Sequence, residues 1–355
     1  MSRTAGTGTE HPTLVDSPPA PTALPRTLTP MKPRLAASGF NSPDHLFELK
    51  WDGIRALVSA DRNGLHIVDR NGGDLLSAIP ELRSLRLPEG TILDGEVIVC
   101  DSRGRPSYDL LVGRLGPTLP KRGKGPIFVA FDLLYDNHRP LLGLALEERR
   151  ARLLGHGFAQ KGLVVPEHLE NDGEPFLDVV AEYELEGVVA KRRDGRYVPG
   201  ARSADWLKCL VSPRADVVIG GLVSDERRGA RALLCGWANE SGGLTSAGEA
   251  YVPPYLGTWL EGATRAFHTE HSPFAGPFSV RPGTVWLRPR LVAIVDHEDT
   301  AGLQLVDARF RALRFDGRPD DCRIEEPVEV PEYPPTGGRE GPRLVVLHAL
   351  PFSSD

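Results

Sequence analysis

The chain has 355 residues, of which 40% are hydrophobic and 25% charged, and its formal net charge is −6. This length accommodates two domains, and the composition is that of a globular protein rather than a disordered or fibrous one. No apolar run is long enough to cross a membrane, no signal peptide begins the chain, and the four cysteines lack metal-ligand spacing. We expect a cytosolic, zinc-free protein. Its acidic balance argues against charge-driven coating of nucleic acid, but leaves room for a local basic groove.

Residues 1–25 are rich in Thr, Pro, Ser and Gly and are predicted to be disordered. An extended, proline-punctuated lead-in follows over 26–36. Strand-like runs at 46–47 and 56–58 then flank Lys50. Since Asp52 and Gly53 follow at once, we predict a tight turn, with Gly53 supplying either a positive φ or a close backbone approach.

Lys50 is a candidate nucleophile. A single lysine is most often a solvated surface residue, but this chain has only seven lysines among its 42 basic residues. A position that keeps lysine in so arginine-rich a chain suggests a task that arginine cannot perform. Arginine stays protonated, whereas lysine can lose its proton and attack an electrophile.

The pattern Glu48-x-Lys50-x-Asp52-Gly53-x-Arg55 resembles the first motif of the covalent nucleotidyltransferases, which include ATP-dependent DNA ligases, RNA ligases and mRNA capping enzymes. In that family the lysine forms a covalent bond to the nucleotide. The resemblance implies that Lys50 is the nucleophile, that Arg55 stabilises the reacting phosphate and that Glu48 binds the nucleotide.

The next predicted elements are a strand over 65–70 that ends at Arg70, a short helix over 74–86 and a strand over 91–99. Asp94 and Glu96 interrupt the last strand, and a buried carboxylate needs a cation or a donor. Asp94 fits a structural salt bridge, while Asp-Gly-Glu resembles the family's third motif, in which Glu96 would serve the ribose or a metal. From the sequence alone, Arg70 is interpreted as an exposed residue at the end of a strand. The family resemblance instead implies that Arg70 contacts the nucleotide or the DNA end.

Residues 102–125 form a basic loop that is either simply solvated or a phosphate-contacting surface for DNA. A buried strand over 127–135 follows, and then helices over 144–155 and 175–184. Phe131 lies in that strand and would ordinarily be a core residue. The resemblance instead makes it the ring that stacks on adenine.

Glu186 and Lys191 bracket a short apolar strand over 185–193. Strand alternation places residues five apart on opposite faces, so periodicity alone does not bring both into one pocket. The string resembles the family's fourth motif, whose glutamate helps to bind metal, and implies a phosphate-stabilising role for Lys191. Residues 205–210 resemble the fifth motif, in which Lys208 would contact the α-phosphate.

The chain changes character after residue 213. Residues 214–323 contain no lysine, and short strands at 217–222, 233–237, 285–287 and 291–295 with a helix over 258–268 predict a small β-barrel. The resemblance identifies it as an oligonucleotide-binding (OB) barrel. Residues 309–319 resemble the sixth motif, in which Arg314 would orient the leaving pyrophosphate. Gly317 stands where that motif has a lysine, which puts the barrel's assistance to adenylation in question.

Residues 324–355 are rich in Pro and Glu and are predicted to be a mostly disordered tail. Its apolar patch at 344–347 is read as part of a plain tail, with a docking element as the alternative.

These expectations combine into an α+β fold. A nucleotidyltransferase domain (an ATP-grasp-like DNA ligase adenylation domain) over 26–211 precedes an OB-fold domain over 212–323, with 1–25 and 324–355 as flanking segments. The whole resembles the short, core-only bacterial ATP-dependent DNA ligases of repair. The resemblance implies ATP as substrate, Mg²⁺ or Mn²⁺ held by Glu96 and Glu186, and nicked or broken duplex DNA and repair proteins as partners. It further implies a monomer that is cytoplasmic, nucleoid-associated and free of membranes.

Two alternatives stay open. An RNA ligase shares the chemistry and differs in its substrate, RNA ends in place of nicked DNA. A non-catalytic nucleic-acid-binding scaffold is the other, motivated by Gly317 and the acidic net charge. In a scaffold, Lys50→Ala would leave DNA binding and biological activity unchanged.

Overall fold

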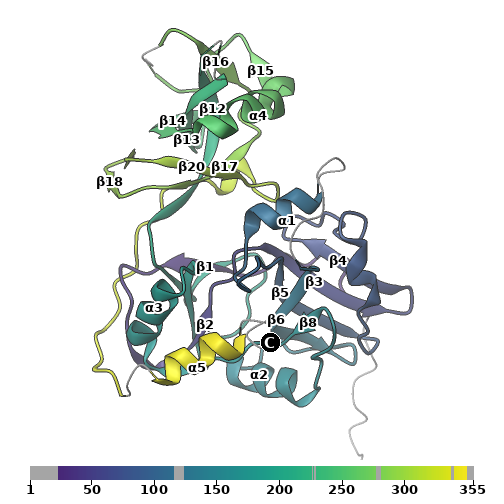
Figure 1. Ribbon diagram of the computed structural model, residues 1–355. Coiled ribbons are helices and arrows are strands. Elements are labelled where there is room, and N and C mark those ends of the chain that lie inside the picture. Colours follow the sequence, from purple (N-terminus) through teal and green to yellow (C-terminus); the bar gives the residue numbers. More distant parts are fainter. Residues whose placement is uncertain are drawn as a thin grey trace, which may run out of the picture.

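The computed structural model describes residues 23–115, 124–225, 227, 229–276, 281–336 and 340–349. The predicted disorder of residues 1–22 and the part of the basic loop at 116–123 lie outside the described residues. Two bodies are visible in Figure 1, one built on two sheets with helices around them and one built on a barrel.

The first body is organised by two β-sheets. One sheet has five strands in the order β1-β11-β10-β2-β9, and the other has the order β4-β3-β5-β6-β7 with β8 paired to β6. The first comprises β1 (Lys32–Leu35), β11 (Arg202–Leu210), β10 (Gly187–Arg192), β2 (Ser42–Leu49) and β9 (Leu169–Asn171). The second comprises β4 (Gly64–Asp69), β3 (Ile54–Asp61), β5 (Thr91–Ile98), β6 (Ile127–Asp136), β7 (Arg139–Pro140) and β8 (Leu163–Val164).

Three helices accompany these sheets: α1 (Tyr108–Leu115), α2 (Leu146–Gly155) and α3 (Gly173–Glu182). The predicted helix over 74–86 is wrong, since that segment holds only the 3₁₀ turn η1 (Pro80–Ser84). Its proline has no N–H to donate within a longer helix, although Leu82 and its apolar neighbours are buried as the pattern indicated. Throughout the described ranges, no helix has the length and apolar character required to cross a membrane.

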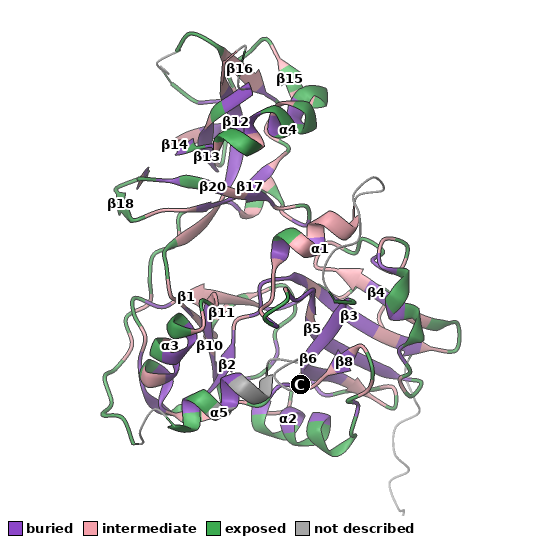
Figure 2. Ribbon diagram, in the orientation of Figure 1, coloured by how far each residue is buried: buried purple, intermediate pink, exposed green. Residues whose placement is uncertain are grey.

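Buried apolar side chains fill both sides of the junction between the sheets. One cluster contains Phe47, Phe131 and Trp206, and another contains Phe128 and reaches the barrel through Ile294. The central strands β2, β3, β5, β6 and β10 are largely buried, whereas the edge strands β1, β4, β7 and β9 and the outward faces of the helices are partly or fully exposed (Figure 2). The sheets therefore provide a rigid frame for the residues at their strand ends.

The second body contains the predicted barrel, which closes through a ring of five strands, β12-β13-β14-β20-β17, whose last member pairs again with β12. These strands are β12 (Arg214–Asp225), β13 (Gly229–Ala238), β14 (Leu244–Tyr251), β17 (Val292–Asp296) and β20 (Arg309–Leu313). The remaining elements are α4 (Pro254–Thr264), η2 (Arg265–Phe267), β15 (His268–Thr269), β16 (Thr284–Leu287), β18 (Asp299–Ala301), β19 (Gln304–Val306) and η3 (Pro319–Asp321).

The described part of the C-terminal tail is ordered, so the expectation of a mostly disordered tail is wrong there. The chain leaves the barrel, and Val328 forms a parallel bridge with Ala36 next to β1. Helix α5 (Glu340–Ala349) then packs on α3 and buries Val345 and Val346 in the core of the first body. Burial of this apolar pair offsets the entropy of ordering the segment.

Candidate active site

A cavity of about 860 Å³ lies where the two sheets meet the barrel. Every candidate site residue from the sequence borders it: Glu48, Lys50, Arg55, Arg70, Glu96, Phe131, Glu186, Lys191, Lys208 and Arg314. The fold thus brings together residues that are spread over most of the chain.

Lys50 lies where the backbone crosses from one sheet to the other, just after β2 ends and before β3 begins. Its N–H donates to the carbonyl oxygen of Gly187 over 2.9 Å, which ties the crossing to β10. A Cβ at Gly53 would lie 2.3 Å from the carbonyl oxygen of Val97. Close approach to β5, rather than a positive φ, therefore explains this glycine.

The Lys50 amine forms an ion pair with the carboxylate of Glu186. Its Nζ donates to Glu186 Oε1 over 2.7 Å, and a guanidinium nitrogen of Arg214 lies 3.0 Å from the same oxygen. Although burial opposes it, the positive charges of Lys50 and Arg214 hold the pKa of Glu186 below its usual value. Glu186 is thus an anion inside the cavity.

Lys191 forms another buried ion pair of the cavity. Its Nζ donates to Glu48 Oε2 over 2.7 Å and lies 4.1 Å from the centre of the Phe131 ring. Burial lowers the pKa of Lys191, while Glu48 opposes the change. Glu186 and Lys191 both border the cavity. Glu186 lies just before the first residue of β10, so the alternation of side chains along that strand does not apply to it.

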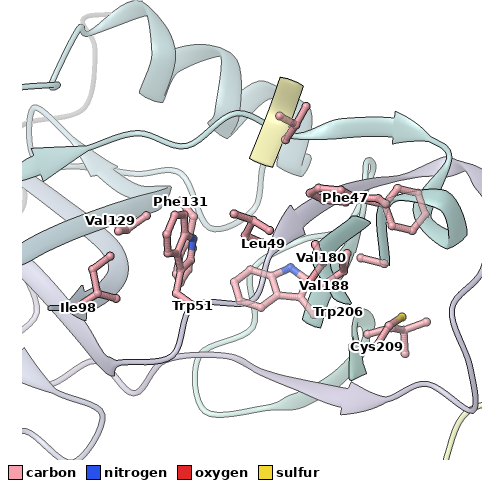
Figure 3. Close-up of a cluster of buried hydrophobic side chains, with 14 of the residues drawn as sticks. Phe47, Leu49, Trp51, Ile98, Val129, Phe131, Val180, Val188, Trp206 and Cys209 are labelled. Atoms are coloured by element: carbon pink, nitrogen blue, oxygen red, sulfur yellow. The ribbon is translucent and has the colours of Figure 1, made fainter. Parts of the chain in front are cut away.

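Arg55 is held in place by the buried carboxylate of Asp94. Its Nε and Nη2 each donate to the carboxylate of Asp94 over 2.6 Å, and Tyr197 donates to the same carboxylate over 2.6 Å. The guanidinium carbon lies 4.5 Å from the Phe131 ring centre, within range of a cation–π contact. Figure 3 shows Phe131 in a cluster with Trp51 and Trp206. The salt bridge predicted for Asp94 is present.

Glu96 lines the cavity from β5, half-buried beside Gly53. Burial raises the pKa of Glu96 to about 8, although Arg55 and Lys50 oppose the shift. No group of three or more metal-binding side chains occurs in the part of the chain that the structure describes. Mg²⁺ is commonly bound by one or two carboxylates together with substrate phosphates, and Glu96 and Glu186 fit that chemistry.

The segment after β20 faces this cavity from the barrel. Arg314 Nε lies 2.8 Å from Asp216 Oδ2, and Arg70 Nε donates to the carbonyl oxygen of Asp316 over 2.8 Å. Arg70 therefore joins the first body to the barrel. A Cβ at Gly317 would lie 2.7 Å from Val292 Cβ, so this turn has no room for a lysine unless the barrel shifts.

Sequence reasoning missed several charged residues of the cavity. Arg214, the first residue of β12, was not among the predicted site residues. Lys32 was not among them either, and it pairs with Asp321 over 2.8 Å. Lys208 Nζ lies 3.0 Å from Glu325 Oε2. No motif marks Arg214 in the sequence, and nothing in the tail distinguished Glu325 from its neighbours.

The chain is similar to known proteins in both sequence and structure. The family model described as "ATP dependent DNA ligase domain" matches residues 31–209. LigD of Mycobacterium tuberculosis, a "multifunctional non-homologous end joining DNA repair protein", is 36% identical over 301 residues, which are 80% of this chain and 38% of LigD. The SPbeta prophage-derived DNA ligase-like protein LigB of Bacillus subtilis is 30% identical over 194 residues, covering 55% of this chain and 71% of LigB.

Among solved structures, mycobacterial DNA ligase D complexed with ATP and MES superimposes with a TM-score of 0.59 at 35% identity. The match covers 85% of this chain and 99% of that one. The chain belongs to the ATP-dependent DNA ligase family, and its fold is a nucleotidyltransferase domain followed by an OB barrel. It spans about two fifths of the length of the LigD proteins that it matches.

Proposed function

We propose that this chain is an ATP-dependent DNA ligase that seals nicks or breaks through a lysyl–AMP intermediate. Lys50 attacks the α-phosphate of ATP, its nitrogen forms a bond to phosphorus, and pyrophosphate leaves. The observation that carries the proposal is the placement of the Lys50 amine 2.7 Å from Glu186 within a cavity lined by further cations.

The adenine would bind between apolar and charged groups at one end of the cavity. Phe131 offers a ring face for stacking, and the ion pair of Lys191 with Glu48 offers a donor and an acceptor beside that ring. Selectivity for ATP would follow, because a base of different hydrogen-bonding pattern leaves one of these buried groups unpaired.

The phosphates would bind near Lys50. Lys208, Lys191 and Arg55 supply positive charge to the α-phosphate as its charge develops. Mg²⁺ or Mn²⁺, held by Glu96 and Glu186, would offset the charge of the phosphates. Arg314 approaches from the barrel to orient the outgoing pyrophosphate, and Arg70 would contact the nucleotide or the DNA end.

We propose further that residues 26–211 and 212–323 act as two units. They close for adenylation and open to admit DNA. AMP then passes from Lys50 to the 5′-phosphate at a nick, the 3′-hydroxyl attacks that phosphate, and AMP leaves. The relatives named for end joining and DNA repair favour nicked or broken duplex DNA as substrate and a role in repair. We further propose repair proteins as partners and a cytoplasmic, nucleoid-associated monomer, as the family resemblance implies.

The test is a sealing assay on a labelled nicked DNA duplex and on a matched duplex whose nick lies between ribonucleotides. We expect the DNA nick to be sealed in the presence of ATP and Mg²⁺ and the RNA nick to be sealed poorly. Lys50→Ala should abolish sealing, whereas Lys161→Ala, a change at an exposed lysine, should not. Preferential sealing of the RNA nick would favour an RNA ligase. If the wild-type protein sealed neither nick and Lys50→Ala bound DNA as well as wild type, a scaffold would be favoured.

A further inference from the structure

The segment that follows the barrel forms part of the cavity wall. Residues 323–327 border the same cavity as Lys50, although they lie beyond every motif of the family. Within this segment the Glu325 carboxylate reaches two cations. Its Oε2 lies 3.0 Å from Lys208 Nζ, and its Oε1 accepts a hydrogen bond from Arg202 over 2.7 Å.

Backbone hydrogen bonds hold the segment in this position. The Val328 N–H donates to the carbonyl oxygen of Leu35 over 2.8 Å, and the Ala37 N–H donates to the carbonyl oxygen of Val328 over 3.1 Å. This pairing extends the edge of the five-stranded sheet beyond β1. Glu325, three residues before Val328, is therefore positioned by the sheet itself.

The remainder of the segment is anchored further along the first body. Thr336 donates to the Asp172 carboxylate through both its N–H and its hydroxyl. Helix α5 then buries Val346 completely and pairs Arg343 with Glu182. The strap, residues 322–336, is therefore held to the first body at Val328 and at Thr336, and its residues 323–327 line the cavity.

The chemistry at Lys208 indicates what Glu325 does. A carboxylate oxygen at 3.0 Å occupies the place that a phosphate oxygen of a bound nucleotide would take on the same ammonium. Burial lowers the pKa of Lys208, and Glu325 opposes that shift, so the carboxylate favours the charged form of the lysine. Two anions on one ammonium would repel each other.

We propose that Glu325 is a site residue supplied by the C-terminal strap, which occupies the phosphate position at Lys208 and is displaced when ATP binds. This inference rests on the proposed function, because it assigns ATP to the cavity. The carboxylate keeps Lys208 charged and positioned in the empty protein. Because ATP must displace the Glu325 carboxylate from Lys208, ATP binds more weakly than it would to a protein without that carboxylate.

The exposure of the Lys208–Glu325 ion pair sets how strongly Glu325 can weaken ATP binding. The side chains of Lys208 and Glu325 are 19% and 25% exposed, so their pairing is partly screened by solvent. Ion pairs of this kind change equilibria by about two- to fivefold. Glu325→Gln should therefore lower the KM for ATP in lysyl–AMP formation by about two- to fivefold, with the rate at saturating ATP unchanged.

The experiment compares wild type, Glu325→Gln and Glu329→Gln, which removes an exposed carboxylate of the same segment. Initial rates of adduct formation are measured against ATP concentration, and ATP binding is measured by calorimetry on the same proteins. A lower KM and a tighter affinity for Glu325→Gln alone would support the inference. A KM for ATP and a dissociation constant for ATP that are unchanged or higher in Glu325→Gln would overturn it.

The two measurements separate this inference from the proposed function. If wild type forms no adduct, the proposed function fails, while calorimetry still decides whether Glu325 competes with the nucleotide. If wild type forms the adduct and Glu325→Gln behaves as wild type in both measurements, only the role of Glu325 fails.

Discussion

The Lys50 amine and the Glu186 carboxylate form a 2.7 Å ion pair at the point where the backbone crosses between the two sheets. The pair fixes the position of the amine before nucleotide binds. In the proposed reaction, Glu186 would then exchange Lys50 for a metal ion or share its oxygens between them.

Glu186→Gln should slow lysyl–AMP formation by about 10- to 100-fold, the range found when a group that supports metal binding is removed. The neutral amide keeps the shape of the side chain but loses its attraction for a cation. Single-turnover adduct formation at increasing Mg²⁺ concentration measures this. A rate equal to that of wild type at every Mg²⁺ concentration would show that Glu186 has no part in the step.

The raised pKa of Glu96 predicts a pH-dependent requirement for metal. Below its pKa of about 8 the carboxyl group holds a proton, which must leave before the group binds a cation. The apparent affinity for Mg²⁺ in adenylation should thus rise by up to about tenfold for each pH unit until that value is reached. Mg²⁺ titrations of adduct formation at several pH values measure it, and an equally steep rise in Glu96→Gln would contradict the assignment.

The same group affects stability. Because the native pKa of Glu96 exceeds the ordinary carboxyl value, the folded protein keeps a proton that the unfolded chain releases. The stability contributed by this group is therefore present at acidic pH and is lost as the pH rises toward about 8. Thermal unfolding near pH 6 and above pH 8 should show a smaller loss of stability in Glu96→Gln than in wild type, and identical losses would be inconsistent with this pKa.

A second ion pair is structural. Arg149 on α2 and Asp132 on β6 are both fully buried, with Arg149 Nε 2.8 Å from Asp132 Oδ1. Arg149→Met should lower the free energy of unfolding by about 3–5 kcal/mol, because it leaves a buried carboxylate without its partner. Urea denaturation measures the loss. The double variant with Asp132→Leu should recover much of it, and a double variant as unstable as the single one would argue against the pair as the cause.

Gly317 offers a test of the barrel's departure from the family motif. Since a Cβ there would lie 2.7 Å from Val292 Cβ, Gly317→Ala should destabilise the protein by about 1–3 kcal/mol. Val292→Ala keeps the Val292 Cβ but removes the Cγ1 atom that would lie 2.9 Å from the new Cβ, so it should relieve part of this cost and the two changes should be non-additive. Gly317→Lys should not accelerate adenylation. A faster and equally stable Gly317→Lys protein would show that the turn accepts the lysine after all.

The candidate site was largely predictable from the sequence, because each motif places its chemistry at the end or in the middle of a recognisable strand. Lys50 precedes a turn, Glu96 interrupts an apolar strand and Phe131 lies within one. Local pattern and chemistry therefore coincide at these positions. All of them border one cavity.

The pairings between motifs were not predictable, since they depend on the register of strands that are distant in the chain. Antiparallel pairing of β10 with β2 aligns Val189 with Glu48 and so brings Lys191 to that carboxylate. Helix α5 escaped prediction for a similar reason. Its order comes from burying Val345 and Val346 against α3, and composition alone favoured a disordered tail.

The most direct measurement of the central claim is incubation of the purified protein with α-labelled ATP and Mg²⁺, followed by a denaturing gel and mass-spectrometric mapping of the adduct. We expect a labelled band that is lost on adding pyrophosphate, maps to Lys50 and is absent from Lys50→Arg. An adduct that persists in Lys50→Arg or maps to another lysine would contradict it. So would the absence of any adduct in protein shown by mass to be free of AMP beforehand.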